Sequence, residues 1–177
     1  MNKNSVKKSR EIIQQKKNCF TPEERIQRFL ESVELFYSKV ETEWLSILLK
    51  RGCRLADDER KCWILEKGFD PYEVKMKVII KDNKRILLKP IGTMSQGIYG
   101  RVDLIYEAKS EMFVLIGKGI VSPRQLLERI DMENSGKIPF PSIDELEWKY
   151  ASKYPDLKYE TLDSDVFFNT IKRVIHG

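Results

Sequence analysis

Apolar residues recur at steps of three and four between residues 26 and 48, which is the spacing of one helical face. The chain before this run offers a capping box in Thr21 and Glu24, with Pro22 suited to the first helical position. Gly52 supplies a stop. The pattern predicts a long amphipathic helix of about eight turns, whose apolar stripe comprises Ile26, Phe29, Leu30, Val33, Phe36, Tyr37, Val40, Trp44, Ile47 and Leu48.

The middle of the chain alternates apolar and polar positions, as half-buried strands do. Residues 74–80 alternate, Asp82 and Asn83 supply a turn, and residues 85–89 form the returning strand. Residues 102–106 and 112–116 predict a second hairpin that turns at residues 108–110. We expect only a short strand near residue 63, because residues 54–61 are highly charged and indicate a solvated loop.

Helical signals return at Ser122 and Pro123, a cap followed by a first-turn proline. Residues 136–141 indicate an extended connector, and residues 143–152 fit either a helix or a strand. Residues 157–162 predict a strand, and Asp163 or Ser164 caps a last helix. The order predicts an α+β fold, with a long N-terminal helix packed on a mostly antiparallel four- to five-stranded sheet, and C-terminal helices.

Charge divides the chain into two parts. Residues 1–18 carry six basic side chains and one acidic, so they hold the whole formal net charge of +5. We therefore expect a basic, flexible N-terminal tail over residues 1–20 and a single α+β domain over residues 21–177. Such a tail keeps a protein soluble, and it can also contact nucleic acid weakly and in a salt-dependent way.

Composition narrows the class of protein further. Hydrophobic residues make up 41% of the chain, which is a globular composition, and no apolar run approaches the ~18–20 residues that span a bilayer. No secretory signal is evident. Cys19, Cys53 and Cys62 are odd in number and lack C-x-x-C spacing, which favours reduced thiols. We expect a cytoplasmic protein with no membrane segment, no metal and no cofactor.

Histidine chemistry is scarce in this sequence. His176 is the single histidine and the next-to-last residue of the chain. Ser-His and Cys-His nucleophiles and the usual zinc sites all need histidine in the folded body. An enzyme here would depend on carboxylates, on lysine or on a carboxylate-bound metal. The sequence therefore favours a protein that is not an enzyme.

A glycine-rich segment at residues 92–102 resembles two nucleotide-binding loops. Residues 92–97 have the spacing of a P-loop, but Ile98 and Tyr99 follow where lysine and serine or threonine are required. Residues 95–102, Ser-Gln-Gly-Ile-Tyr-Gly-Arg-Val, resemble the glycine loop of protein kinases, and Lys118 lies near the place of that family's strand lysine. The 59 residues after Lys118 cannot hold a catalytic lobe, so the kinase interpretation fails.

The same segment also resembles a nuclease motif. Arg101-Val102-Asp103 followed by Ile116-Gly117-Lys118 is similar to the motif of the PD-(D/E)XK nucleases, whose order of helices and strands this chain can follow. The resemblance implies that Asp103 binds Mg²⁺ and Lys118 steadies the attacking water. A turn at residues 109–110 would place Asp103 opposite Ile116. Ile116 stands where the second acid belongs, so the resemblance fits an active nuclease or a degenerate relative.

A simpler interpretation gives this segment no chemistry. Arg101 and Asp103 lie two residues apart on one strand face, where they can pair with each other or across the sheet. Gly97 and Gly100 then only form a turn or a bulge before the strand. On this interpretation Tyr99, Arg101 and Asp103 are candidate binding residues.

We therefore expect a small cytosolic interaction or regulatory module, such as an accessory subunit or an antitoxin- or immunity-type binding protein. It would act through contacts with a protein partner. One alternative is the active or degenerate PD-(D/E)XK-like, Mg²⁺-dependent nuclease that uses Asp103 and Lys118. Another is nucleic-acid binding through Lys7, Lys8 and Arg10 of the basic tail.

Overall fold

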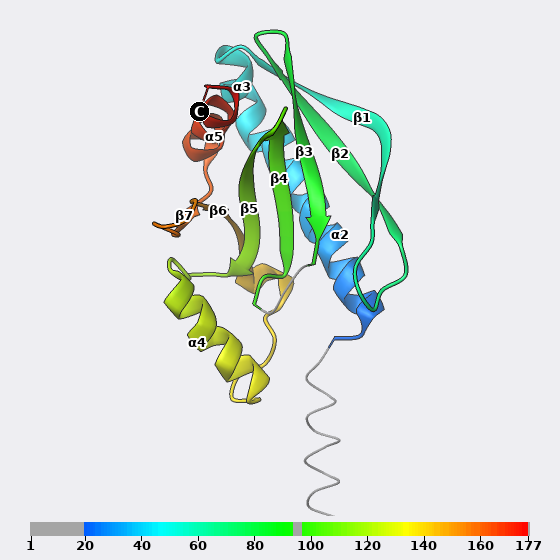
Figure 1. Ribbon diagram of the computed structural model, residues 1–177, viewed down its shortest axis with the longest axis vertical. Coiled ribbons are helices and arrows are strands. Elements are labelled where there is room, and N and C mark those ends of the chain that lie inside the picture. Colours follow the sequence, from blue (N-terminus) through cyan, green and yellow to red (C-terminus); the bar gives the residue numbers. More distant parts are fainter. Residues whose placement is uncertain (1–19, 94–96, 177) are drawn as a thin grey trace, which may run out of the picture.

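The computed structural model describes residues 20–93 and 97–176. Within these residues a seven-stranded antiparallel sheet has its strands in sequence order from β1 to β7, and a long helix crosses one of its faces (Figure 1). The α+β class is confirmed. The sheet is larger than the predicted four or five strands. Lys7, Lys8 and Arg10 of the predicted tail lie outside the described residues, so their contact with nucleic acid stays a prediction.

The long helix forms where the capping signals predict it. It consists of α2 (Pro22–Lys39), a π-helical turn η1 (Val40–Trp44) and α3 (Leu45–Lys50). The Glu24 carboxylate accepts a hydrogen bond from the Thr21 backbone N–H at 2.8 Å, and the Thr21 hydroxyl accepts one from the Glu24 N–H. Gly52 follows the helix with a φ of +76°, a conformation that glycine adopts without steric cost.

Five strands form a continuous meander after the helix. They are β1 (Cys53–Ile64), β2 (Tyr72–Lys81), β3 (Lys84–Gly92), β4 (Gly100–Tyr106) and β5 (Lys109–Gly117). The predicted turn at Asp82 and Asn83 is confirmed. The β4–β5 turn lies at residues 107–108, earlier than predicted. In the resulting register Asp103 faces Met112, so its predicted position opposite Ile116 is wrong.

The charged stretch at residues 54–61 belongs to strand β1, so its prediction as a loop is wrong. β1 is an edge of the sheet and pairs only with β2 within the described residues, with a register shift between Asp58 and Cys62. Charged side chains are common on edge strands because they discourage pairing with another sheet. The polar pattern therefore reflects the edge position of a regular strand.

The C-terminal part of the chain adds two short strands and two helices. Helix α4 (Pro123–Asn134) precedes a 3₁₀ turn η2 (Ile143–Glu145), strands β6 (Leu146–Ala151) and β7 (Tyr159–Thr161), and helix α5 (Ser164–His176). Residues 143–152, predicted as either helix or strand, thus form a short turn followed by a strand. The Asp163 carboxylate accepts hydrogen bonds from the backbone N–H groups of Asp165 and Val166, which caps α5.

The two faces of the sheet are covered differently. Helices α2 and α5 pack on one face around Phe36, whose ring lies 5.8 Å from that of Phe113 and 6.1 Å from that of Phe167. Helix α4 packs on the other face, where Leu126 joins Val114 in a smaller apolar cluster. One end of the sheet is therefore bordered by the start of α2 and by the end of α4 (Figure 1).

Candidate functional site

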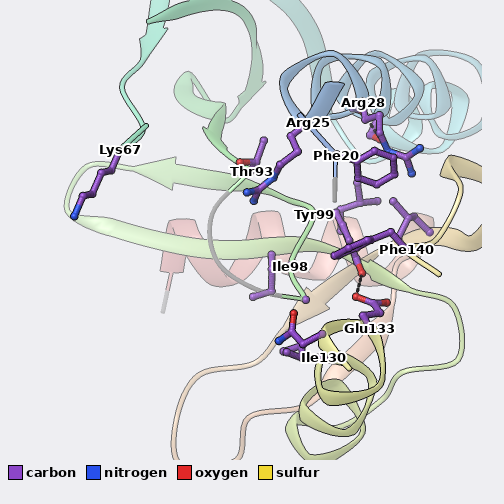
Figure 2. Close-up of a pocket in the computed structure, with 15 residues that line it drawn as sticks. Phe20, Arg25, Arg28, Lys67, Thr93, Ile98, Tyr99, Ile130, Glu133 and Phe140 are labelled. Carbon is purple, nitrogen blue, oxygen red and sulfur yellow. Dashed lines mark hydrogen bonds between the residues drawn. The ribbon is translucent and has the colours of Figure 1, made fainter. Parts of the chain in front are cut away.

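A cavity of about 790 Å³ opens at the end of the sheet where β3 ends and β4 begins (Figure 2). Segments that are distant in the sequence line it, among them the start of α2, residues 97–99 before β4, the C-terminal half of α4, and the connector before η2. We call it the end cavity. Its lining includes Phe20, Arg25, Arg28, Lys67, Thr93, Ile98, Tyr99, Ile130, Glu133 and Phe140.

Two arginines from the first turns of α2 line the end cavity. The Arg28 guanidinium donates a hydrogen bond to the Pro141 carbonyl at 2.5 Å and lies 4.3 Å from the centre of the Phe20 ring. The Arg25 guanidinium lies 5.4 Å from the centre of the Phe69 ring. Within residues 20–93 and 97–176, neither arginine forms an ion pair with a carboxylate. Both arginines are charged at any physiological pH, so the cavity has a positive wall.

Aromatic and aliphatic side chains form the rest of the lining. The rings of Phe20 and Phe140 lie 5.7 Å apart, and Figure 2 shows them beside Tyr99 and Arg28. Ile130 contributes an aliphatic surface from α4. An apolar concave surface with a few polar groups is typical of binding sites.

A buried carboxylate anchors α4 to the wall of the end cavity. Glu133 is 4% exposed and accepts hydrogen bonds from the Tyr99 hydroxyl at 2.5 Å and from the Arg129 Nε at 2.6 Å. Burial and this hydrogen bond to Glu133 raise the pKa of the Tyr99 phenol, so Tyr99 remains protonated at neutral pH. The Glu133 charge is thus neutralised within the fold.

A second carboxylate, Glu66, fixes the end of β3 in a similar way. It accepts hydrogen bonds from the Tyr72 hydroxyl at 2.5 Å and from the Thr93 backbone N–H at 2.7 Å, and the Thr93 hydroxyl donates a third at 2.5 Å. Burial and the hydrogen bond to Glu66 raise the pKa of Tyr72. Glu66 therefore holds Thr93 against the end cavity.

The glycines of the segment at residues 97–100 have a packing role. Gly97 has a φ of +75°, and a Cβ there would lie 2.4 Å from the Ile130 Cγ1. A Cβ on Gly100 would lie 2.7 Å from the Phe29 Cδ2. Real Cβ atoms do not approach other atoms so closely, so glycine at these two positions allows α4 and α2 to pack against the β3–β4 connection.

The predicted binding pair Arg101 and Asp103 lies elsewhere, on the sheet face opposite α2. The Arg101 Nε and Nη2 donate to the two Asp103 carboxylate oxygens, each at 2.7 Å, and Asp103 is only 6% exposed. This is a bidentate ion pair, the strongest common geometry for these two side chains. Asp103 therefore faces Arg101 of its own strand.

The two residues of the nuclease hypothesis are far apart. Asp103 pairs with Met112, and Lys118 lies just beyond the end of β5 at Gly117. Gly117 lies five positions beyond Met112, which corresponds to about 17 Å along a strand. Within the described parts of the chain, no group of three or more histidine, cysteine or acidic residues is arranged to hold a metal ion. The structure does not bring Asp103 and Lys118 together.

Tyr99 is the predicted binding residue that the structure places in the end cavity. The sequence interpretation did not identify Arg25, Arg28, Glu133 or Phe140 as site residues. The two arginines carry a weak signal, because they stand three residues apart on the flank of the apolar stripe of α2. Glu133 and Phe140 carry no such signal in the sequence. Their neighbours in the end cavity, Tyr99 and Phe20, come from distant parts of the chain.

Comparison of the chain with protein-family models, with curated proteins and with solved structures finds no match. Among the described residues, no helix is both long enough and apolar enough to cross a bilayer. The function proposed below therefore rests on the geometry of the end cavity.

Proposed function

We propose that this protein is a binding module that recognises a protein partner through the end cavity and acts by contact. The observation that carries this proposal is the pair Arg25 and Arg28, which line the cavity and have no carboxylate partner among the described residues. A partly buried cation is stabilised by an opposite charge, and a guanidinium binds a carboxylate through two parallel hydrogen bonds. An acidic group of the partner would supply that charge.

The remainder of the lining supports the same proposal. Aromatic residues and arginine are the side chains that contribute most to protein interfaces, because they bury a large surface and keep directional polar groups. Here Phe20, Phe140 and Tyr99 lie around Arg28. The cavity volume also falls in the range of about 300–1,000 Å³ that is typical of ligand sites.

The acidic groups beside the end cavity serve the fold. Glu133 accepts two hydrogen bonds and Glu66 accepts three from the protein itself. A general base needs a lone pair directed at the substrate. The existing hydrogen bonds instead support a structural role for both carboxylates, which agrees with binding by contact.

Affinity capture with the full-length protein tests this proposal. The wild type would be compared with the double variant Arg25→Ala/Arg28→Ala and with the matched control Arg124→Ala, an arginine on α4 that is 89% exposed and lies outside the cavity lining. We expect wild type and control to retain the same stoichiometric partner and the double variant to lose it. Equal retention by the double variant would refute the proposal.

A further inference from the structure

A second cavity of about 330 Å³ lies next to the end cavity along α2. Ser32, Leu115 and Leu146 line both cavities, so the two are neighbours. The Trp148 indole N–H donates to the Ser32 carbonyl at 3.1 Å near their junction, which ties β6 to α2. We call the two neighbouring cavities together the α2 groove.

One stripe of α2 borders the whole groove. Its residues are spaced by three or four positions, as neighbours on a helix face are: Arg25, Arg28, Ser32, Leu35 and Lys39. The fourteen positions from the first to the last span about 21 Å at 1.5 Å per residue. An extended peptide of about six residues covers that length.

Basic side chains occur along the entire α2 groove. Arg25, Arg28 and Lys67 line the end cavity, whereas Lys39 and Lys118 line the second. Lys39 lies 5.4 Å from the centre of the Trp44 ring and pairs with no carboxylate among the described residues.

The groove contains two acidic residues, and both are paired. Glu133 is held by Tyr99 and Arg129, as described above. The Glu147 carboxylate forms an ion pair with the Lys149 ammonium at 2.9 Å. It also accepts a hydrogen bond from the Gly119 backbone N–H at 2.9 Å. The charge left for a ligand is therefore positive along the length of the groove.

Each of the two cavities also has an apolar wall. Phe20 and Phe140 line the end cavity, while Leu35 and Trp44 line the second. Leu35 is 55% exposed, which is a large apolar surface for a helix position next to a depression. A ligand that covers Leu35 would remove this surface from water.

We propose that the α2 groove binds an extended, acidic segment of the protein partner, about six residues long, with one apolar side chain in each cavity. This inference rests on the proposed function and names the chemistry of the recognised segment. The acidic side chains would pair with Arg25, Arg28, Lys39 and Lys118. The apolar side chains would pack on the two apolar walls, which fixes the register of the segment.

The lining of the second cavity favours a peptide over a nucleic acid. Proteins that bind single-stranded nucleic acid stack bases on exposed aromatic rings that follow one another along a basic path. The rings of the second cavity are buried or already stacked, because Phe36 is 2% and Trp44 5% exposed and the Trp148 ring lies 5.1 Å from that of Phe36. Its exposed apolar side chain is Leu35, which packs with aliphatic or aromatic side chains. Charge and apolar surface together thus match an acidic peptide with apolar anchors.

Peptide binding to the full-length protein tests the inference. The probes are fluorescent peptides of about eight residues that combine acidic residues with two leucine or phenylalanine anchors at varied spacing. A matched set replaces every acidic residue by lysine, and a third probe is a single-stranded DNA of similar length. We expect anisotropy titrations to show saturable binding of an acidic peptide, with binding at least tenfold weaker for its lysine counterpart.

Three variants locate the binding. Arg28→Ala changes the end cavity, Leu35→Ser changes the second, and Leu127→Ser is the matched control because Leu127 is 61% exposed on α4 and lines neither cavity. We expect Arg28→Ala and Leu35→Ser each to weaken the acidic peptide at least fivefold and Leu127→Ser to leave its affinity unchanged. Circular dichroism confirms that each variant is folded.

Failure of this inference can be distinguished from failure of the proposed function. Peptide binding that ignores Leu35→Ser, tighter binding of the DNA probe, or no saturable binding of any acidic peptide would overturn the groove inference. None of these results bears on whether partner capture depends on Arg25 and Arg28, because the capture experiment measures that dependence separately. Capture that is independent of both arginines would overturn the proposed function itself.

Discussion

Arg101 and Arg28 have opposite electrostatic environments in one small fold. Arg101 donates two hydrogen bonds to Asp103 on the same strand, so each side chain neutralises the other. Arg28 donates to a backbone carbonyl and stacks on an aromatic ring, and both interactions leave its full charge in place. The first arginine has an opposite charge within the fold, whereas the second faces a cavity that offers none among the described residues.

This difference separates a structural cluster from a candidate binding site. An ion pair within one strand stabilises the sheet, and because both charges are already paired it contributes little to binding a partner. A positive cavity with an aromatic wall stabilises the fold less, but it can bind an acidic group of a partner strongly. Substitutions at the Arg101–Asp103 pair should therefore lower stability more than binding. Substitutions at the end cavity should lower binding more than stability.

The largest loss of stability is expected from Asp103→Ala. Removing the carboxylate leaves the Arg101 charge unpaired, and its side chain is only 31% exposed. We expect the free energy of unfolding to fall by about 3 kcal/mol in denaturant titrations, at the low end for a buried pair. Replacing both partners, as in Arg101→Met/Asp103→Leu, should recover most of that loss. A change below about 0.5 kcal/mol in the single variant would show that the pair contributes little.

A smaller loss is expected from Gly97→Ala at the end cavity. The positive φ and the short distance to Ile130 both oppose a side chain, so α4 must shift to make room. We expect a cost of about 2 kcal/mol in the same titration. Gly119→Ala is a matched control, since Gly119 also has a positive φ but a Cβ there would meet nothing within 4 Å. Equal costs at the two positions would mean that backbone conformation alone is responsible.

The Tyr99→Phe variant should change the alkaline stability. Burial raises the pKa of Tyr150 to about 12, and it also raises the pKa values of Tyr99 and Tyr72. An unfolded chain loses these protons near pH 10. The stabilisation by these protonated phenols is therefore fully present below pH 10 and is lost as the pH rises through the folded pKa values.

Unfolding titrations between pH 9 and 11.5 measure this effect. Tyr99→Phe removes one of the phenols whose pKa is raised and one hydrogen bond to Glu133, so it should cost about 1.5 kcal/mol near neutral pH. It should also make the decline above pH 10 less steep than in the wild type. An identical decline in both proteins would show that Tyr99 titrates at its ordinary pKa.

Much of the fold follows from local signals. The long helix of α2, η1 and α3 begins at the predicted capping box and ends before Gly52, and the β2–β3 hairpin turns at Asp82 and Asn83 as predicted. Most of strand β1 was missed because its charged residues lie on an exposed edge, where no alternation is imposed. Strand β7 lies inside the strand predicted at residues 157–162, whereas residues 143–152, which contain β6, fitted either a helix or a strand. Strands β1 and β6 therefore account for the difference between the predicted and observed sheets.

The site was much less predictable than the fold. Tyr99 was a candidate, but its partner Glu133 lies 34 positions away in the sequence. Arg28 contacts the carbonyl of Pro141, which lies 113 positions away. No local pattern encodes such contacts, because they depend on the packing of α4 and of the connector. The pair Arg101 and Asp103 was visible because its two members are adjacent on one strand face.

The double variant Arg25→Ala/Arg28→Ala separates binding at the end cavity from stabilisation of the fold. Its effect on stability should be about 1.5 kcal/mol, half that of Asp103→Ala, because one hydrogen bond to a carbonyl and two partly exposed cation–π contacts are lost. Its effect on binding should be large. The measurement is the affinity for the captured partner and the free energy of unfolding, both determined on the same preparation. We expect the affinity of the double variant to be at least tenfold weaker, with most of the stability preserved. Unchanged affinity, or a stability loss as large as that of Asp103→Ala, would contradict this expectation.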